Sequence, residues 1–230
     1  MALSRLFRPG TRANPKIFDK DYLFLRTLTK ELKRALAGVN DEHLSILDVG
    51  STNGPYLSLL TGKYRRYLTI DIETPKVKPG ILGEAQYLPI ASGSVDVCLC
   101  TQVLEHVENP SKVVSELARV LKEGGILLLS THGVFHYHPY PHDYWRWTPE
   151  GLDKIIRQYF ADVTIKPNGG TMLLLFHIIG RGIFFIADRS LFIRVLQYTL
   201  YPAINILGLI ADKLVKDHSL SMNYLAVAIK

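Results

Sequence analysis

Residues 130–152 concentrate side chains that can exchange protons or bind polar ligands. The stretch reads STHGVFHYHPYPHDYWRWTPEGL and holds His132, His136, His138, His142 and Asp143 in a short span. Imidazoles and carboxylates can take the proton of a hydroxyl group that is about to react. We therefore select His138, His142 and Asp143 as candidate general bases.

The aromatic residues of this stretch, Tyr144, Trp145 and Trp147, favour substrate recognition, because flat aromatic faces suit sugar rings. Packing of the loop onto the rest of the fold explains each of them equally well. The four histidines lack the cysteines and the helical spacing of a structural zinc site. We therefore predict no metal site from this stretch.

A glycine-containing turn is the second feature with chemical potential. Residues 46–56, ILDVGSTNGPY, form an apolar strand-like run that reaches Asp48 and turns through Gly50 to Gly54. Glycines at such a turn let the backbone pass close to a ligand and adopt a positive φ. The G-x-G-x-x-G spacing of a dinucleotide site is missing, so a nicotinamide-dependent oxidoreductase is disfavoured.

Further motifs follow the turn in a fixed order. YLTIDI contains Asp71, whose carboxylate can accept both hydroxyls of a ribose, GEAQYLP contains Glu84, and VDVCLCTQVLEHV contains Gln102. Together, residues 45–131 resemble the class I S-adenosylmethionine-dependent methyltransferases with a D-x-G-x-x-x-G turn, G-[DE]-A-x-x-L-P and V-L-E-H-V. The resemblance implies methyltransferase activity and S-adenosylmethionine as the cofactor.

The resemblance also assigns a part of the cofactor site to each motif. The turn would shape the methionine end, the acid after the second strand would hold the ribose, the Glu-Ala pair would lie beside the adenine, and Gln102 would lie near the methionyl group. Thr52 departs from the family, which usually has a smaller residue there, and is expected to narrow the site. The expected cofactor-binding residues are Asp48, Gly50, Ser51, Gly54, Asp71, Ile72, Glu84, Ala85 and Gln102.

Two resemblances concern the acceptor. Some class I O-methyltransferases bind a metal through E-x-x-E-H and a later histidine, but this chain has Gln102 before Glu105 and His106, so we expect no metal. Glu105 and His106 would then orient backbone and substrate loops. The run H-P-x-P-H-D-Y-W-R-W-T-P-E-G-L resembles a subgroup found with cell-envelope and polysaccharide enzymes, in which this loop covers the acceptor.

These residues need a scaffold, and the sequence alternates strand-like and helical patterns. Strands are expected at 45–50, 67–72, 81–85, 95–101, 125–131 and 224–230, and helices at 17–37, 55–60, 110–121 and from 148. Near-continuous apolar strands alternating with helices predict a parallel sheet covered on both faces. We expect an α/β, Rossmann-like, doubly wound, seven-stranded, mostly parallel sheet with an antiparallel last strand and an apolar helical insertion before it.

Length and composition set the frame. The 230 residues suit one methyltransferase domain over 1–230, with an N-terminal cover segment at 1–40. Cys98 and Cys100 lie two apart in one strand, so they point to opposite faces and do not pair. Together with a first segment unlike a secretory signal, they favour a cytoplasmic protein.

The tail at 171–216 is strongly apolar but carries polar and basic residues. His177 and Arg181 interrupt its first half, and Asn205 lies in the second, so a membrane span is not expected. Helices lying in a membrane interface and a homodimer contact both fit. The basic residues that flank or interrupt the tail are Arg181, Arg189, Arg194, Lys213 and Lys216.

The sequence-based prediction of function is O-methylation of a saccharide or lipid-linked glycan, at the inner face of the membrane if the tail binds there. One alternative is methylation of a lipid, quinone or other small hydrophobic acceptor. Another is a non-catalytic cofactor-binding partner subunit, which Thr52 and Gln102 motivate. The net charge of +6 resides in the flanks, without a basic stripe interleaved with aromatic residues, so no nucleic-acid partner is expected.

Overall fold

The computed structural model describes the chain except for residues 1–10, 40–42, 61, 63, 75 and 188–190. It divides into two compact units. One comprises residues 32–166 and 223–230, and the other comprises residues 1–31 and 167–222. The prediction of one domain over 1–230 with a cover segment at 1–40 stays a prediction, and residues 1–10 and 40 of that segment lie outside the described residues.

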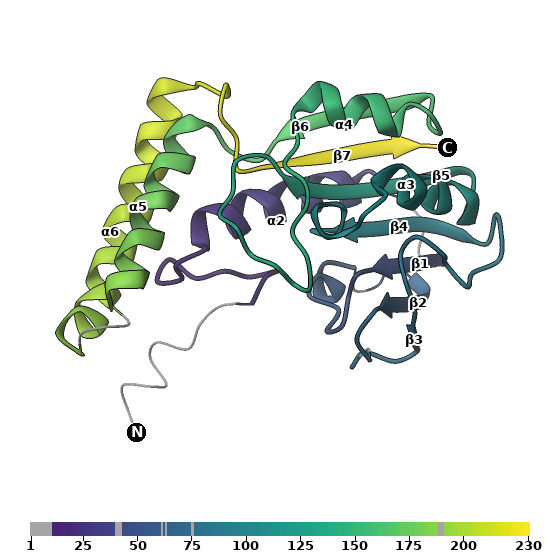
Figure 1. Cartoon of the computed structure of the whole chain (residues 1–230), viewed down its shortest axis with the longest axis horizontal. Helices are drawn as coiled ribbons and strands as arrows, with labels where there is room; N and C mark the ends of the chain where they lie inside the picture. Colours follow the sequence, from purple (N-terminus) through teal and green to yellow (C-terminus); the bar gives the residue numbers. More distant parts are fainter. Residues whose placement is uncertain (1–10, 40–42, 61, 63, 75, 188–190) are drawn as a thin grey trace. The chain divides into compact units, whose positions relative to one another are not determined.

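A seven-stranded sheet with the order β3-β2-β1-β4-β5-β7-β6 forms the first unit (Figure 1). β1 pairs in parallel with β2 and β4, β2 with β3, and β4 with β5, whereas β5 and β7 are antiparallel. The expected doubly wound, Rossmann-like sheet is confirmed. The strands are β1 (Leu44–Val49), β2 (Tyr64–Asp71), β3 (Gly80–Leu82), β4 (Val95–Thr101), β5 (Leu121–His132), β6 (Asp162–Pro167) and β7 (Asn223–Ile229).

The middle strands are apolar on both sides because both sides are covered. In β4, Val97, Cys98, Leu99 and Cys100 are all buried, as expected for a parallel sheet with helices on its faces. Both cysteines are free, and burial raises the pKa of each thiol. The central strands therefore form a rigid core from which the residues at the strand ends project.

Two helices of this unit begin with a side-chain cap. In α3 (Pro110–Val120), the side chain of Asn109 accepts a hydrogen bond from the backbone N–H of Lys112 at 3.0 Å. In α4 (Pro149–Ile156), Thr148 accepts from the N–H of Gly151 at 3.1 Å. Each cap satisfies an N–H that has no partner within its helix.

Local predictions differ from the structure in several places. The helix expected at 17–37 begins at Tyr22, and the strand expected at 81–85 covers only Gly80–Leu82. Residues 55–60 do not form an α-helix but contain a 3₁₀ turn, η1 (Leu57–Leu59), in a segment between the positive-φ glycines Gly54 and Gly62. Strand β6 was not predicted individually, since three of its six residues are polar and it ends in proline, which gives a weak strand signal.

The second unit is built on two apolar helices, α5 (Thr171–Ala187) and α6 (Leu191–Val215), which pack side by side (Figure 1). Gly208 permits close packing, because a Cβ there would lie 2.9 Å from the Cβ of Phe176. Helix α2 (Tyr22–Ala37) begins in this unit and ends in the other. Arg189 lies outside the described residues, and the structure does not describe the side chain of Arg194.

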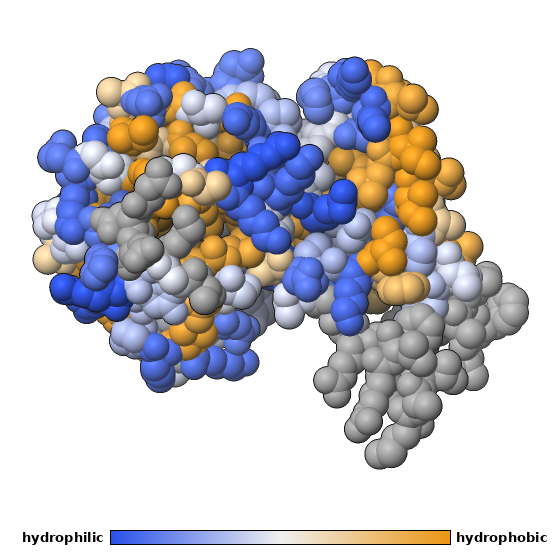
Figure 2. Space-filling model, turned by 180° about the vertical axis from the view of Figure 1, so that it is seen from behind, coloured by the Kyte–Doolittle hydropathy of each residue, from blue (hydrophilic) through white to orange (hydrophobic). Residues whose placement is uncertain are grey.

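Apolar side chains are exposed along the pair α5 and α6, where Figure 2 shows a continuous hydrophobic surface. No helix in the described part of the chain is both long and apolar enough to cross a membrane. The exposed residues include Ile178, Ile179, Phe185, Ile206, Leu207 and Ile210.

A buried polar cluster lies inside this helical unit. Arg181 forms an ion pair with Asp21 at 2.9 Å, and Asn205 donates to the carbonyl of Ile17 at 2.7 Å. Burial lowers the pKa of His177 to about 4, an effect that Asp21 opposes and that Arg181 and Lys20 reinforce. The folded unit therefore favours the neutral imidazole.

The pKa of His177 predicts how stability depends on pH. In the unfolded chain the imidazole takes up a proton near its ordinary pKa of about 6.5, whereas the folded form resists protonation until about pH 4. The unfolded state thus binds more protons between these values, and stability falls as the pH falls. We expect a loss of up to roughly 3 kcal/mol from this residue between about pH 7 and pH 4.

Urea unfolding followed by circular dichroism measures this loss. His177→Leu removes the titrating group, so its stability should fall less than that of the wild type over the same pH range. Equal losses in the two proteins would show that His177 does not contribute.

Candidate functional site

The residues expected to bind the cofactor lie after four neighbouring parallel strands. The turn from Gly50 to Gly54 follows β1, Asp71 ends β2, and Gln102 follows β4. The N–H groups of Gly50 and Ser51 donate to the carbonyl of Ile70 at 2.8 and 3.2 Å. Because carboxyl ends of parallel strands share one edge, the sheet brings these residues to the edge where doubly wound folds bind ligands.

Two glycines of the turn cannot be replaced without strain. Gly50 has φ +72°, and a Cβ on it would come within 2.2 Å of Val103 Cγ2. Gly54 has φ +56°, and its Cβ would lie 3.0 Å from Val77 Cγ2. The N–H of Gly54 also donates to Ser51 Oγ at 3.2 Å. The chain thus turns tightly after β1, with no room for side chains at positions 50 and 54.

Asp48, near the end of β1, supports the turn from the protein interior. Its side chain is fully buried, and the hydroxyl of Tyr67 donates to its Oδ2. Burial, followed by the nearby Asp48 carboxylate, raises the pKa of Tyr67 well above its usual value, so the phenol stays protonated and remains a donor. Asp48 therefore shapes the turn from within the protein.

Thr52 has a role that the sequence did not indicate. Its hydroxyl donates to Asp71 Oδ2 at 2.9 Å, and the N–H of Glu73 donates to Oδ1 at 3.1 Å. These two bonds fix the carboxylate of Asp71 and leave lone pairs on both oxygens, enough to accept a diol. Thr52, which departs from the residue usual in the resembling family, therefore orients Asp71, the residue expected to bind the ribose.

The remaining expected cofactor residues differ in their surroundings. Ile72 and Glu84 are exposed, and Ala85 packs against the core. Gln102 has φ +59°, rare for a residue other than glycine. Its Nε2 donates to Ser130 Oγ at 2.8 Å and to Asn223 Oδ1 at 2.9 Å, which joins the ends of β4, β5 and β7. Strain of this kind concentrates at functional sites.

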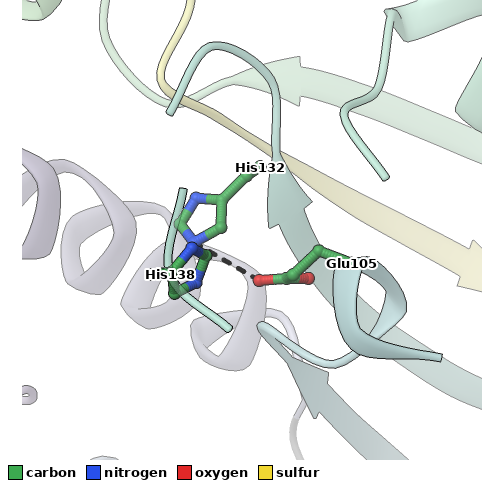
Figure 3. A group of neighbouring side chains, drawn as sticks. All are labelled: Glu105, His132 and His138. Atoms are coloured by element: carbon green, nitrogen blue, oxygen red, sulfur yellow. Dashed lines mark ion pairs between the residues drawn. The ribbon is translucent and has the colours of Figure 1, made fainter. Parts of the chain in front are cut away.

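Beside the expected cofactor residues, the side chains of Glu105, His132 and His138 converge (Figure 3). Glu105, on the 3₁₀ turn η2 (Leu104–His106), and His132, at the end of β5, are buried, and His138 follows in the loop. One ligand-capable atom from each lies within 4.8 Å of the others. Glu105 Oε1 is 3.3 Å from His132 Nε2, while Oε2 accepts from Thr131 at 2.9 Å.

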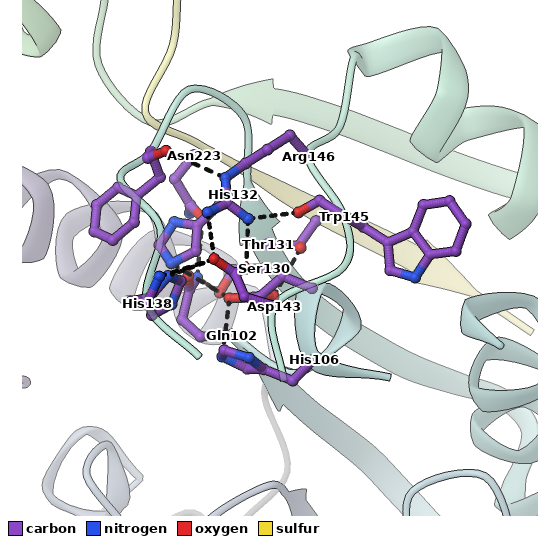
Figure 4. Close-up of polar contacts among 12 residues, drawn as sticks. Gln102, His106, Ser130, Thr131, His132, His138, Asp143, Trp145, Arg146 and Asn223 are labelled. Atoms are coloured by element: carbon purple, nitrogen blue, oxygen red, sulfur yellow. Dashed lines mark hydrogen bonds and ion pairs between the residues drawn. The ribbon is translucent and has the colours of Figure 1, made fainter. Parts of the chain in front are cut away.

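Of the three predicted bases, only His138 belongs to this cluster (Figure 4). Asp143 is clamped by Arg146 Nη1 and Nη2 at 2.6 and 2.7 Å, which holds the pKa of its carboxyl well below the usual range. Asp143 is therefore ionised and accepts from the backbone N–H of His138 at 2.9 Å. His142 is exposed, and its ring lies beside Tyr144.

Glu105 and His132 were not among the predicted catalytic residues. The available signal was their position shortly after β4 and at the end of β5, at the edge of the sheet where doubly wound folds bind ligands. His138 is partly buried, which lowers its pKa below the ordinary value although Asp143 opposes the shift. Its imidazole is therefore mostly neutral near pH 7 and can accept a proton or coordinate an ion.

The loop at 133–147 is fastened on both sides. The N–H groups of Tyr144 and Trp145 donate to the carbonyl of Glu105 at 2.7 and 3.3 Å, and that of Trp147 donates to the carbonyl of His132 at 3.0 Å. Tyr140 donates to Glu73 Oε1 at 2.8 Å, close in sequence to Asp71. The loop therefore connects the histidine cluster with the expected ribose end of the site.

A hollow at the opposite edge of the sheet, lined by Leu44, Val97 and Ile126, contains none of these residues. It lies at the amino ends of β1 and β4 and within β5. Ligands of doubly wound sheets bind outside the carboxyl ends, so the hollow is not the candidate site.

Comparison with known proteins gives the same assignment for the central part of the chain. Residues 47–129 match the methyltransferase domain family. An uncharacterized methyltransferase of Mycolicibacterium gilvum is 30% identical over 114 residues, which cover 45% of this chain and 45% of that protein. The chain thus spans less than half the length of this relative.

Solved structures share the fold. A methyltransferase from Archaeoglobus fulgidus that depends on S-adenosylmethionine aligns with a TM-score of 0.58 at 17% identity, covering 89% of this chain and 94% of that one. A phosphoethanolamine N-methyltransferase from Haemonchus contortus, bound to phosphomonomethylethanolamine and S-adenosylhomocysteine, aligns with a TM-score of 0.59 at 18% identity over 93% of this chain and 56% of that one.

The turn after β1 yields a prediction about stability. Gly50→Ala adds a Cβ 2.2 Å from Val103 Cγ2 at a positive φ, and we expect it to cost roughly 3 kcal/mol of unfolding free energy. Gly93→Ala is the matched control, because Gly93 has φ +59° but open space around it, and should cost about 1 kcal/mol. Urea unfolding measures both values, and equal costs would contradict the close approach of Val103.

Proposed function

We propose that this chain, a class I S-adenosylmethionine-dependent methyltransferase whose residues 47–129 match the methyltransferase domain, methylates a hydroxyl oxygen of a saccharide or lipid-linked glycan. The observation that carries this proposal is the cluster of Glu105, His132 and His138 beside the carboxyl edge of the sheet. A group that activates a hydroxyl is needed there only if the acceptor atom is an oxygen of high pKa.

The residues around the turn suit the cofactor. The two positive-φ glycines keep the turn free of side chains, so that a ligand can approach its backbone. Asp71 is oriented by Thr52 and the N–H of Glu73 to receive a ribose diol. Glu84 and Ala85 follow β3, on the far side of β2 from the turn, where the adenine is expected. S-adenosylmethionine supplies an electrophilic methyl group: the oxygen–carbon bond forms as the carbon–sulfur bond breaks, and its electron pair remains on sulfur.

The loop supports a saccharide as the acceptor. Tyr137 and Tyr140 are 75% and 69% exposed, and Tyr144 and Trp145 are also exposed. Aromatic faces with polar edges stack on sugar rings while their hydroxyl and indole groups hydrogen bond. Trp147, in contrast, is partly buried and packs against the core, so its role is structural.

The helical unit supports a lipid-linked acceptor. The exposed apolar side chains of α5 and α6 form a surface that water solvates poorly (Figure 2). Exposed Lys213 and Lys216 near the end of α6 add positive charge. An apolar face with basic residues fits peripheral binding to an anionic bilayer at the cytoplasmic side. A homodimer contact through the same face is the competing explanation.

Loss of the ribose ligand tests the function. Asp71→Ala should weaken binding of S-adenosylmethionine and S-adenosylhomocysteine by about 100-fold, because two charge-assisted hydrogen bonds of roughly 1.5 kcal/mol each are lost. Thr52→Val, which keeps the carboxylate but removes its orienting hydroxyl, should weaken binding by only about tenfold. Calorimetric titration gives each affinity.

Asp153→Ala is the control, since Asp153 lies on α4 and pairs with Arg157. The same proteins are then incubated with radiolabelled S-adenosylmethionine and membrane extracts, and the label is followed into glycolipid, simple-lipid and soluble-saccharide fractions. Label in the glycolipid or saccharide fraction supports the proposal. Label confined to simple lipids or quinones would show that the acceptor is one of these and not a glycan. If the wild type does not bind the cofactor, the proposed methyltransferase activity is refuted.

The apolar face predicts binding to vesicles. Ile206→Glu with Ile210→Glu places two charges on one side of α6 and should reduce co-sedimentation with anionic phospholipid vesicles at least tenfold. Ala161→Glu with Thr164→Glu adds the same charge at exposed positions away from α6 and should change binding little. Light scattering tests the alternative of a homodimer contact. If the wild type is a dimer that does not bind vesicles, and the α6 variant is a monomer, the apolar face is a dimer contact.

A further inference from the structure

We propose that Glu105, His132 and His138 form a binding site for one divalent metal ion of the zinc class. The sequence led to the expectation of no metal, since the known E-x-x-E-H pattern is incomplete. The structure points to a different set of donors, because His132 and His138 are brought to Glu105 from separate parts of the chain. The site itself rests on geometry; its part in catalysis rests on the proposed function.

The spacing of the donors suits a tetrahedral ion. Glu105 Oε1 and His132 Nε2 are 3.3 Å apart. Two ligands at zinc bond lengths of about 2.0–2.1 Å and a tetrahedral angle are separated by about 3.3–3.4 Å. The third donor lies within 4.8 Å of both, so His138 would complete three-fold coordination by moving closer to them. Two imidazoles with one carboxylate are a common protein set for catalytic zinc.

Outer contacts orient each donor. Thr131 donates to Glu105 Oε2 at 2.9 Å and leaves Oε1 directed toward the histidines (Figure 3). Asp143 Oδ2 lies 3.4 Å from His138 Nδ1, and Arg146 holds that carboxylate in place. The carbonyl of His136 lies 3.2 Å from the same Nδ1. These two acceptors at Nδ1 would leave Nε2 of His138 for coordination, an arrangement that accompanies histidine ligands in metal sites. The role of Asp143 is therefore to position His138.

The electrostatics of the cluster favour a cation. The buried carboxylate of Glu105 faces His132 at 3.3 Å and His106 at 4.0 Å, and the His106 and His138 rings are 5.0 Å apart. A divalent ion bound here would offset the charge of the buried Glu105 carboxylate, which is costly to leave uncompensated. A simple ion pair between Glu105 and His132 is the competing explanation.

The position gives the ion a function. Three protein donors leave a fourth tetrahedral position open, and His138 is the partly exposed member of the set. An acceptor hydroxyl that enters this position would lose its proton to water more readily, because the cation lowers its pKa. The ion would thus prepare the oxygen that receives the methyl group.

Metal content and affinity test the site without an acceptor. The full-length protein, freed of metal with a chelator, is titrated with Zn²⁺ against a chromophoric competitor. The wild type should bind one equivalent with at least micromolar affinity. Glu105→Gln, His132→Asn and His138→Asn should each bind about 100-fold more weakly, whereas His43→Asn, the same change at an exposed histidine, should bind as the wild type does.

Calorimetry with S-adenosylhomocysteine reports whether each variant is folded. If a variant fails to fold, X-ray absorption of the zinc-loaded wild type is decisive, because it should show nitrogen and oxygen donors with two imidazoles and no sulfur. Absence of Zn²⁺ binding, or binding that none of the three substitutions weakens, overturns the proposal. Zn²⁺ binding without cofactor binding would instead refute the proposed function and leave the metal site standing.

Discussion

Glu105 is the residue through which most of the acceptor side is held together. Its backbone carbonyl accepts the N–H groups of Tyr144 and Trp145, and its buried carboxylate contacts Thr131 and His132. The end of β4, the end of β5 and the return of the loop therefore meet at one residue. A carboxylate removed from water is costly unless its oxygens are compensated, so the surrounding polar groups and the loop are coupled to its position.

The cofactor side depends on a different constraint, the shape of the turn after β1. Val103 occupies the space that a side chain at position 50 would need, and Val103 directly follows Gln102, which ties β4 to Ser130 and Asn223. Strain at Gln102 and the glycine at position 50 are thus parts of one arrangement. This arrangement places the backbone of the turn close to the expected methionine end of the cofactor, while the side chain of Gln102 bonds to Ser130 and Asn223.

The sequence predicted what depends on local order. Strands β1, β4 and β7 are apolar runs bounded by turns, so alternation predicted them. The expected roles of Gly50, Asp71 and Gln102 came instead from the resemblance to class I methyltransferases. The sequence did not predict that Thr52 would orient Asp71, nor that His132 and His138 would meet Glu105. These contacts bring together residues up to 33 positions apart through the path of a loop, which periodicity and propensity do not specify.

The loop histidines also show why residue type alone did not identify a base. His138, His142 and Asp143 are near neighbours in sequence, yet the fold gives them unlike surroundings. Arg146 stabilises the charged form of Asp143 so strongly that its pKa falls, and a carboxylate held in that form is a weak proton acceptor. The same ion pair, however, fixes the oxygen next to His138 Nδ1. The residue that is least suited to take a proton is thus well suited to position the one that faces Glu105 and His132.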